Sequence, residues 1–164
     1  MRKLAGLLII LAAAASLRAA EDLHLPVSME QLAARATESV DVTLDQSMLQ
    51  FASKFLSKDD PEEAQVKKVV SKLKGVYVRS FEFDKDGQYS LADVEAIRAQ
   101  LKNPKWSRIV STRSKTDNSE VYLQKEGDRV SGLVVISIEP KSLTVVHIDG
   151  PIDPDELSEL SGRM

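Results

Sequence analysis

The chain has 164 residues, a formal net charge of −3, no cysteine and two histidines, and 43% of its residues are hydrophobic. This length and composition are typical of one globular domain and exclude a disordered chain or a repeat array. The absence of cysteine excludes disulfides, thiolate zinc sites, iron–sulfur clusters, a cysteine nucleophile and a lipid-modified cysteine, and two histidines exclude multi-histidine metal sites.

Residues 1–20 are predicted to be a signal peptide. Arg2 and Lys3 precede an uncharged run over residues 4–17, which is shorter than the roughly 20 apolar residues that a membrane-spanning helix needs. We therefore expect export to the periplasm or the extracellular space, with no stable membrane span after cleavage. Arg18 occupies the −3 position for cleavage after residue 20, so an uncleaved, membrane-tethered N-terminus stays open as the alternative.

The charge of the mature chain bears on its partners. Residues 1–20 contain three basic residues and no acidic one, so their removal leaves 19 basic residues against 25 acidic residues, a net charge of −6. Nucleic-acid binding requires a positive surface that neutralises phosphates. We expect no nucleic-acid partner.

The mature chain is predicted to begin with a polar lead-in over residues 21–38, which contains a short helix, and to continue as a single domain over residues 39–164. The domain opens with SVDVTL, in which apolar and polar residues alternate. This period of two predicts a strand with Val40, Val42 and Leu44 inward.

Two helices are predicted after this strand. Asp45 is the expected N-cap of the first helix, in which Met48 and Phe55 belong to a set of apolar residues at helical spacing. Asp60 is the expected N-cap of the second helix. Gly75 is expected to end that helix in the left-handed conformation that glycine adopts readily.

The rest of the chain is predicted to contain two more helices and five strands. The strands are expected over residues 76–83, 106–114, 119–125, 129–139 and 143–148, with a helix from Ser90 after the first of them and a brief helix over residues 157–160. Short connections between the last four strands favour antiparallel hairpins. We predict an α+β fold with about six strands in one antiparallel sheet, element order β-α-α-β-α-β-β-β-β-α, and helices packed on one face.

Several segments in this order and spacing resemble a bacterial family catalogued as domain of unknown function 4252. These segments are VDVTL (40–44), VSKLKG (70–75), VYVRSFEFD (76–84), IRAQL (97–101), WS (106–107), IV (109–110), EVYL (120–123), LTVV (143–146) and GPID (150–153). The resemblance covers nearly all of the mature chain. It implies a small exported single-domain protein, and it assigns no catalytic residue.

One acidic segment has the spacing of a calcium loop. With the glycine of Asp86-Gly87 at the sixth place, carboxylates fall at the first, third, fifth and twelfth places, namely Glu82, Asp84, Asp86 and Asp93. The first is not an aspartate, the twelfth lacks the reach of glutamate, and the preceding segment is predicted as a strand. The alternative is a turn at Asp86-Gly87 followed by a capping box from Ser90 to Asp93.

Arg and Tyr side chains on the predicted strands are candidates for contact with a partner. Tyr77 and Arg79 share one face of their strand, and Tyr122 is the third candidate on what we expect to be an open sheet face. We see no catalytic constellation and no cofactor motif. The sequence therefore predicts a non-catalytic exported domain that binds a protein or envelope component in a regulatory or sensing role. The alternative is a carrier of a small ligand or calcium, and the oligomeric state is left open.

Overall fold

The computed structural model describes residues 27–156, so the predicted signal peptide and the predicted helix over residues 157–160 lie outside the described residues. The elements in chain order are α2 (Val27–Arg35), β1 (Glu38–Asp45), α3 (Gln46–Ser53), α4 (Pro61–Val70), β2 (Gly75–Glu82), α5 (Leu91–Gln100), β3 (Trp106–Arg113), β4 (Asn118–Glu126), β5 (Arg129–Glu139) and β6 (Ser142–Ile152). None of these helices is long and apolar enough to cross a bilayer.

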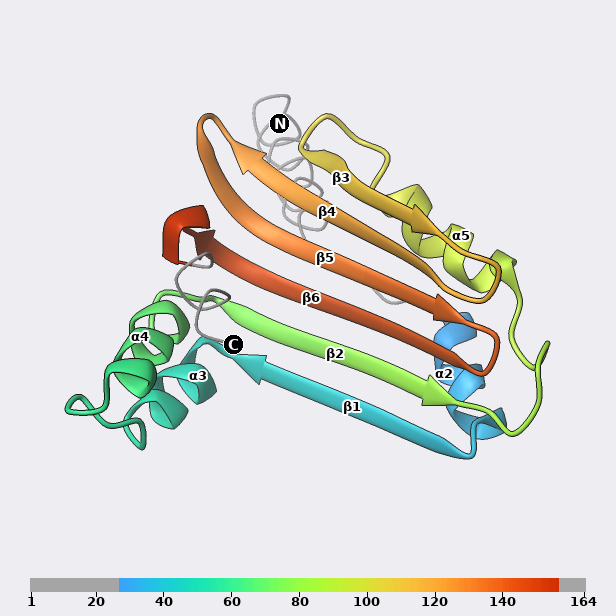
Figure 1. The fold of residues 1–164 in the computed structure, drawn as a ribbon, viewed down its shortest axis with the longest axis horizontal. Coiled ribbons are helices and arrows are strands. Elements are labelled where there is room, and N and C mark those ends of the chain that lie inside the picture. The colour runs from blue at the N-terminus through green and yellow to red at the C-terminus, as the bar shows by residue number, and fades with distance from the viewer. Residues whose placement is uncertain (1–26, 157–164) are drawn as a thin grey trace, which may run out of the picture.

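The six strands form one antiparallel sheet in the order β1-β2-β6-β5-β4-β3 (Figure 1). Strands β3 to β6 follow one another as a meander, and β6 then pairs with β2. The final strand thereby joins the meander to the β1–β2 pair. The predicted α+β class and the antiparallel hairpins are confirmed.

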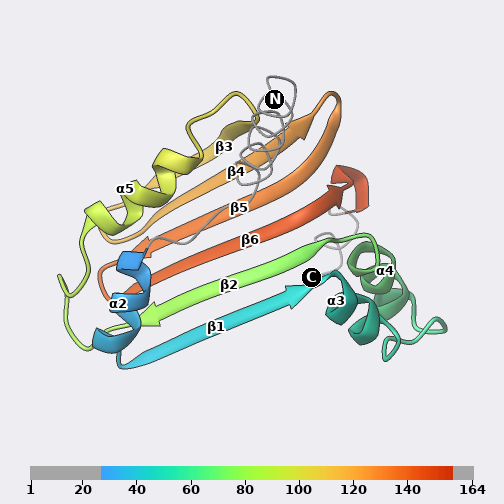
Figure 2. The same cartoon turned by 180° about the vertical axis from the view of Figure 1, so that it is seen from behind.

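One face of the sheet, here called the inner face, is covered by α2 and α5 (Figure 2). Helix α5 contributes Val94 and Ile97 at helical spacing and ends at the buried Leu101, while Leu32 comes from α2. The strands contribute alternate residues, because successive side chains of a strand point to opposite faces. These strand residues are Phe81, Tyr122, Val134, Ile136, Ile138, Leu143 and Val145.

The α3–α4 pair packs on the opposite face, here called the outer face, at the other end of the sheet. Leu49 of α3 and Leu73, which follows α4, form a second apolar cluster with Ile152. Val76 of β2 packs against this cluster. It is separated from the inner-face residue Phe81 of the same strand by an odd number of positions, so its side chain points to the opposite face. The two cores therefore lie on opposite faces at opposite ends. Helices α2 and α5 pack on one face of the sheet, as predicted, whereas the α3–α4 pair packs on the other face.

Some apolar side chains that were predicted to point inward are exposed. Val40 is 41% exposed and Phe55 is 76% exposed, and Met48 is also largely exposed. Val40 lies on the outer face of an end strand, beyond the reach of the α3–α4 pair. Helix α3 buries only Leu49 and Ser53, so its remaining apolar side chains are left on the surface.

The predicted N-caps are confirmed, and the predicted helix end at Gly75 is wrong. Asp60 accepts hydrogen bonds from the backbone N–H groups of Glu62 and Glu63. Helix α4 ends at Val70, and Gly75, which is not among the described glycines with positive φ, opens β2 instead. A Cβ atom at Gly75 would lie 2.6 Å from the Tyr77 hydroxyl. A larger residue here would therefore displace the Tyr77 ring.

Candidate functional site

Arg79 lies on the inner face of β2, close to the β1 edge. Its guanidinium forms an ion pair with Asp41 of β1 and donates hydrogen bonds to the backbone carbonyls of Val42, at 3.3 Å, and Val78, at 3.0 Å. Thr43 Oγ1 lies 3.4 Å from Nη2. Arg79 is only 23% exposed. These contacts hold the guanidinium in one orientation against β1, with one side turned toward α2.

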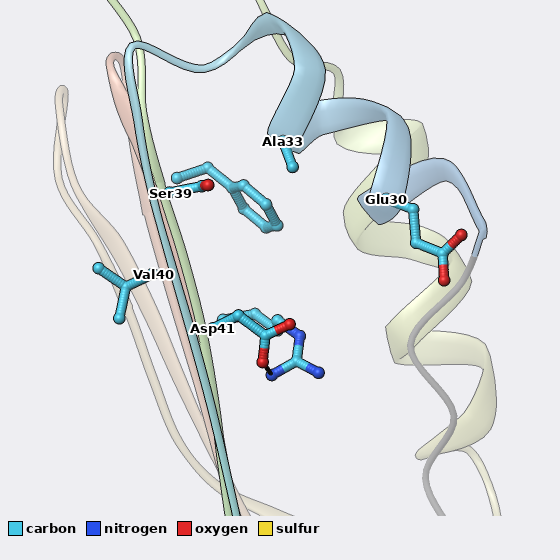
Figure 3. Close-up of a pocket in the computed structure, with 7 residues that line it drawn as sticks. Glu30, Ala33, Ser39, Val40 and Asp41 are labelled. Atoms are coloured by element: carbon cyan, nitrogen blue, oxygen red, sulfur yellow. Dashed lines mark ion pairs between the residues drawn. The ribbon is translucent and has the colours of Figure 1, made fainter.

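A cavity of about 250 Å³ separates this part of the sheet from α2. Figure 3 shows Glu30 and Ala33 of α2 on one side of the cavity and Ser39 and Asp41 of β1 on the other. Val40 points away, to the outer face (Figure 3). The cavity therefore has one carboxylate, that of Glu30, on its helix side and the ion pair of Arg79 with Asp41 on its sheet side.

Tyr77, the second predicted partner-binding residue, stacks on a neighbouring histidine of the inner face. The rings of Tyr77 and His147 are 5.5 Å apart, and those of His147 and Trp106 are 6.1 Å apart. His147 is on the same face of β6 as Val145, two residues away. Trp106 packs against the inner-face core and, together with Gln124, closely approaches the backbone at Gly132. These half-buried aromatic rings lie on the same sheet face as Arg79.

Tyr122, the third predicted residue, is buried. Its side chain belongs to the inner-face core, with 7% of its surface exposed, and its hydroxyl donates a 2.8 Å hydrogen bond to Glu120. The expectation that Tyr122 lies on an open face is therefore wrong. Tyr122 and Glu120 are two residues apart in β4, so their side chains point to the same face of the sheet. That face is the inner face, which α2 and α5 cover.

Glu120 is the centre of a polar network that the sequence did not single out. Its carboxylate is 7% exposed and accepts two hydrogen bonds from Arg98 of α5, at 3.0 and 2.7 Å. Burial raises the pKa of Glu120, but the bonds from Arg98 and Tyr122 outweigh burial, so the pKa lies below its ordinary value. Burial and the bond to Glu120 raise the pKa of Tyr122. The network stabilises the contact between α5 and β4.

The acidic segment over residues 82–93 adopts the alternative structure. Asp93 accepts hydrogen bonds from the backbone N–H and the hydroxyl of Ser90, and these two residues form the capping box of α5. Glu82 belongs to β2, where its carbonyl accepts hydrogen bonds from Thr37. Among residues 27–156, no three carboxylates or histidines converge as metal ligands would. Asp84 and Asp86 lie exposed in the turn.

The outer face carries a feature that the sequence analysis did not identify. One valine from each of the six strands falls in register with the next, forming a line across the whole sheet: Val42, Val78, Val146, Val135, Val121 and Val110. We call this line the valine row. Valine alternation is visible within single strands, but the row emerges only from the pairing register, which strand periodicity does not specify.

A second line of residues runs beside the valine row. It consists of the hydroxyl residues Ser80, Thr144, Ser137, Ser119 and Thr112, with Val40 at its β1 end. We call this line the hydroxyl row. The hydroxyls of Ser80 and Thr144 are 2.8 Å apart and share a hydrogen bond. The two rows form a surface of branched apolar groups and hydroxyls, and none of their residues belongs to the cluster beneath the α3–α4 pair, which lies at one end of the sheet (Figure 1).

Comparison with known proteins identifies the family of the chain. The model of the family described as Domain of unknown function (DUF4252) matches residues 34–160. The chain therefore belongs to this family, and the resemblance inferred from its sequence is confirmed. No curated protein matches the chain.

Proposed function

We propose that this member of the DUF4252 family is a non-catalytic exported domain that docks a protein of the cell envelope on the outer face of its sheet, in a regulatory or sensing role. The observation that carries the proposal is the valine row. Six aligned valines on a sheet face that no helix of residues 27–156 covers at this point are a surface to which an apolar partner surface can dock.

The size of this surface supports a protein occupant. Six strands about 4.8 Å apart, with two rows about 7 Å apart, give a patch of roughly 25 by 14 Å, on the order of 350 Å². The valine row makes up about half of this area, and an exposed apolar patch beside polar groups commonly marks an interaction site. The hydroxyl row adds donors and acceptors, which fix the register of a partner at the edge of the apolar contact.

A charged residue within this surface is expected to abolish docking. Val40→Asp places a carboxylate where a partner would desolvate it, and we expect at least a tenfold loss of affinity. The measurement is site-specific photocrosslinking in the native cell from a photoreactive residue at Val42, followed by mass spectrometry. One protein should be crosslinked in the native background and should disappear in the Val40→Asp background.

Leu91→Asp is the matched control. Leu91 is a largely exposed apolar residue at the start of α5, and the same substitution there should leave the crosslink intact. Equal far-UV circular dichroism of both variants verifies that they fold. If the Val42 probe yields no specific adduct, or if Leu91→Asp removes it equally, the outer face is not the docking surface.

The alternative function, a carrier of a small ligand, is supported by the cavity between α2 and β1. It has the volume of a small organic molecule, and Glu30, Asp41 and Arg79 supply polar groups for a ligand. A thermal-shift panel of small polar metabolites and calcium tests this alternative. A rise in Tm that Arg79→Ala abolishes would favour the carrier, and a rise with calcium alone would direct attention to residues 82–93.

A further inference from the structure

Strand β3 is a free edge of the sheet with a basic cleft beside it. Within residues 27–156 it pairs only with β4, so the backbone groups on its other side have no strand partner. Seven of its eight residues are exposed. Edge strands with unpaired backbone groups are templates for the addition of another strand.

The cleft lies on the inner face, between α5 and the β3–β4 hairpin, and has a volume of about 380 Å³. Four cationic side chains line it, against two carboxylates: Arg98, Lys102, Arg108 and Arg113 against Glu95 and Glu120. Both carboxylates are engaged by Arg98. In the part of the chain that the structure describes, Lys102 and Arg113 make no ion pair, and Arg108 reaches Glu120 only at 3.9 Å. A protein of net negative charge thus has a cleft with an excess of two positive charges.

The spacing of two of these cations matches the repeat of a strand. In the pairing of β3 with β4, Arg108 lies opposite Tyr122 and Arg113 lies opposite Asn118. The two arginines are therefore four register positions apart, because a bulge at Ile109 takes one residue of β3 out of register. Four positions span about 14 Å along a strand. An added strand would therefore place side chains i and i+4 opposite the two arginines.

The other face of β3 is apolar near its centre. Ile109 is 53% exposed, and Val110 ends the valine row. An added strand would present its alternate residues to these side chains. The edge therefore selects a pattern with acidic residues on one face and apolar residues on the other.

We propose that the β3 edge binds an extended acidic segment of a partner protein, which pairs with β3 as a seventh strand, its carboxylates over Arg108 and Arg113 and its apolar side chains against Ile109 and Val110. This site shares Val110 with the valine row, but its strand pairing and its charge contacts do not depend on docking at the outer face. Backbone hydrogen bonds supply affinity, and the charges supply selectivity.

A partner protein suits this edge better than a second copy of the chain. The opposite free edge, β1, has the sequence ESVDVTLD and alternates in the required way. However, Asp45 caps α3 by accepting hydrogen bonds from Met48 and Ser47, and Asp41 is paired with Arg79. Both aspartates of β1 are therefore already engaged within their own chain.

A synthetic peptide provides the test. The labelled, end-blocked peptide ESVDVTLD meets every stated requirement, because its two aspartates are four residues apart and its valines and leucine occupy the other face. Binding to the full chain is measured by fluorescence anisotropy at low salt, together with amide hydrogen exchange over residues 106–113. We expect saturable binding, slower exchange in β3, and at least a fivefold weaker affinity in Arg113→Glu and in 0.5 M salt.

The controls separate strand addition from nonspecific attraction. Lys58→Glu makes the same change of charge in the exposed α3–α4 loop and should leave affinity unchanged, whereas the peptide QSVNVTLN should bind weakly. Absence of binding, equal binding of the neutral peptide, or binding without protection of β3 would overturn the proposal. Concentration-dependent self-association of the chain that Arg113→Ala abolishes would show that a second copy occupies the edge and would overturn the assignment to a partner protein.

Discussion

Glu120→Gln is expected to lower the free energy of unfolding by about 2–3 kcal/mol at neutral pH. The native carboxylate is 7% exposed and is bound by Arg98 and Tyr122. Removal of one partner of a buried ion pair is strongly destabilising, because the other charge stays buried with fewer bonds. Because Arg98 keeps its ion pair with Glu95, we expect a smaller loss of unfolding free energy than the largest losses seen when a buried ion pair is broken. Urea unfolding followed by circular dichroism measures the change.

Glu126→Gln is the control for this substitution. Glu126 is an exposed carboxyl at the other end of β4, and its neutralisation should change the stability by less than about 0.5 kcal/mol. A double-mutant cycle with Arg98→Met isolates the pair, and the coupling should account for most of the loss. Equal effects of Glu120→Gln and Glu126→Gln would show that the network does not stabilise the α5–β4 contact.

The loss caused by Glu120→Gln should also depend on pH. The pKa of Glu120 in the folded chain lies below its ordinary value, so the folded state favours the ionised form. The stabilisation is therefore fully present above the unfolded pKa of about 4.3 and disappears as the pH falls through the folded pKa. The stability difference between the native chain and Glu120→Gln should narrow steadily below about pH 4.5. A difference that stays constant down to pH 3 would contradict the assignment.

The elements and their order were predictable from the sequence because each has a local signal. Two helix starts are marked by capping residues, Asp60 for α4 and Ser90 with Asp93 for α5. Their hydrogen bonds involve only neighbouring residues, so they can be predicted from the local sequence. In the strands of the meander, side chains that point to opposite faces alternate along the sequence with a period of two. Gly132 likewise marks a bulge and a close approach of Gln124, as an isolated glycine within a strand predicts.

The faces of the sheet were not predictable in the same way. Alternation shows that Val40 and Val42 share a face, but it does not show which face α2 covers. The α3–α4 pair lies on one face and α2 with α5 on the other, so valines that look like core residues are left on the surface. Arg79 and Tyr122, which look like surface residues, lie on the covered side. Packing between segments far apart in the chain decides this, and no local pattern encodes it.

The candidate site has the same limitation. Glu120 and Arg98 are separated by an entire strand and a loop, and nothing in either segment marks them as a pair. The valine row likewise requires five strand registers to be known together. Residue type and spacing therefore identified candidate groups, such as Tyr77 and Arg79, while their partners came from the tertiary structure.

Gly150→Ala is expected to cost about 3 kcal/mol of unfolding free energy. Gly150 has φ of +131°, and an added Cβ atom would lie 2.8 Å from the Cα of Leu73 and 2.9 Å from the backbone nitrogen of Lys74. That nitrogen donates a 2.8 Å hydrogen bond to the carbonyl of Asp149. Backbone meets backbone here, so no side-chain rotation relieves the contact, and strain adds to overpacking. Urea unfolding provides the measurement.

Gly127→Ala is the comparison, because Gly127 also has a positive φ, +62°, but has nothing within 4 Å of an added Cβ atom. It should cost only about 1 kcal/mol, because its φ lies in the left-handed region that L residues can enter. The remaining difference combines the greater strain at the φ of Gly150 with the contact between β6 and the segment after α4. Since Leu73 also anchors the outer-face cluster, Gly150→Ala should loosen the α3–α4 pair first, and hydrogen exchange should accelerate over residues 46–74 before the inner-face core. If both variants lose the same free energy of unfolding, the backbone contact between Gly150 and Leu73 adjusts easily and the α3–α4 pair does not depend on it.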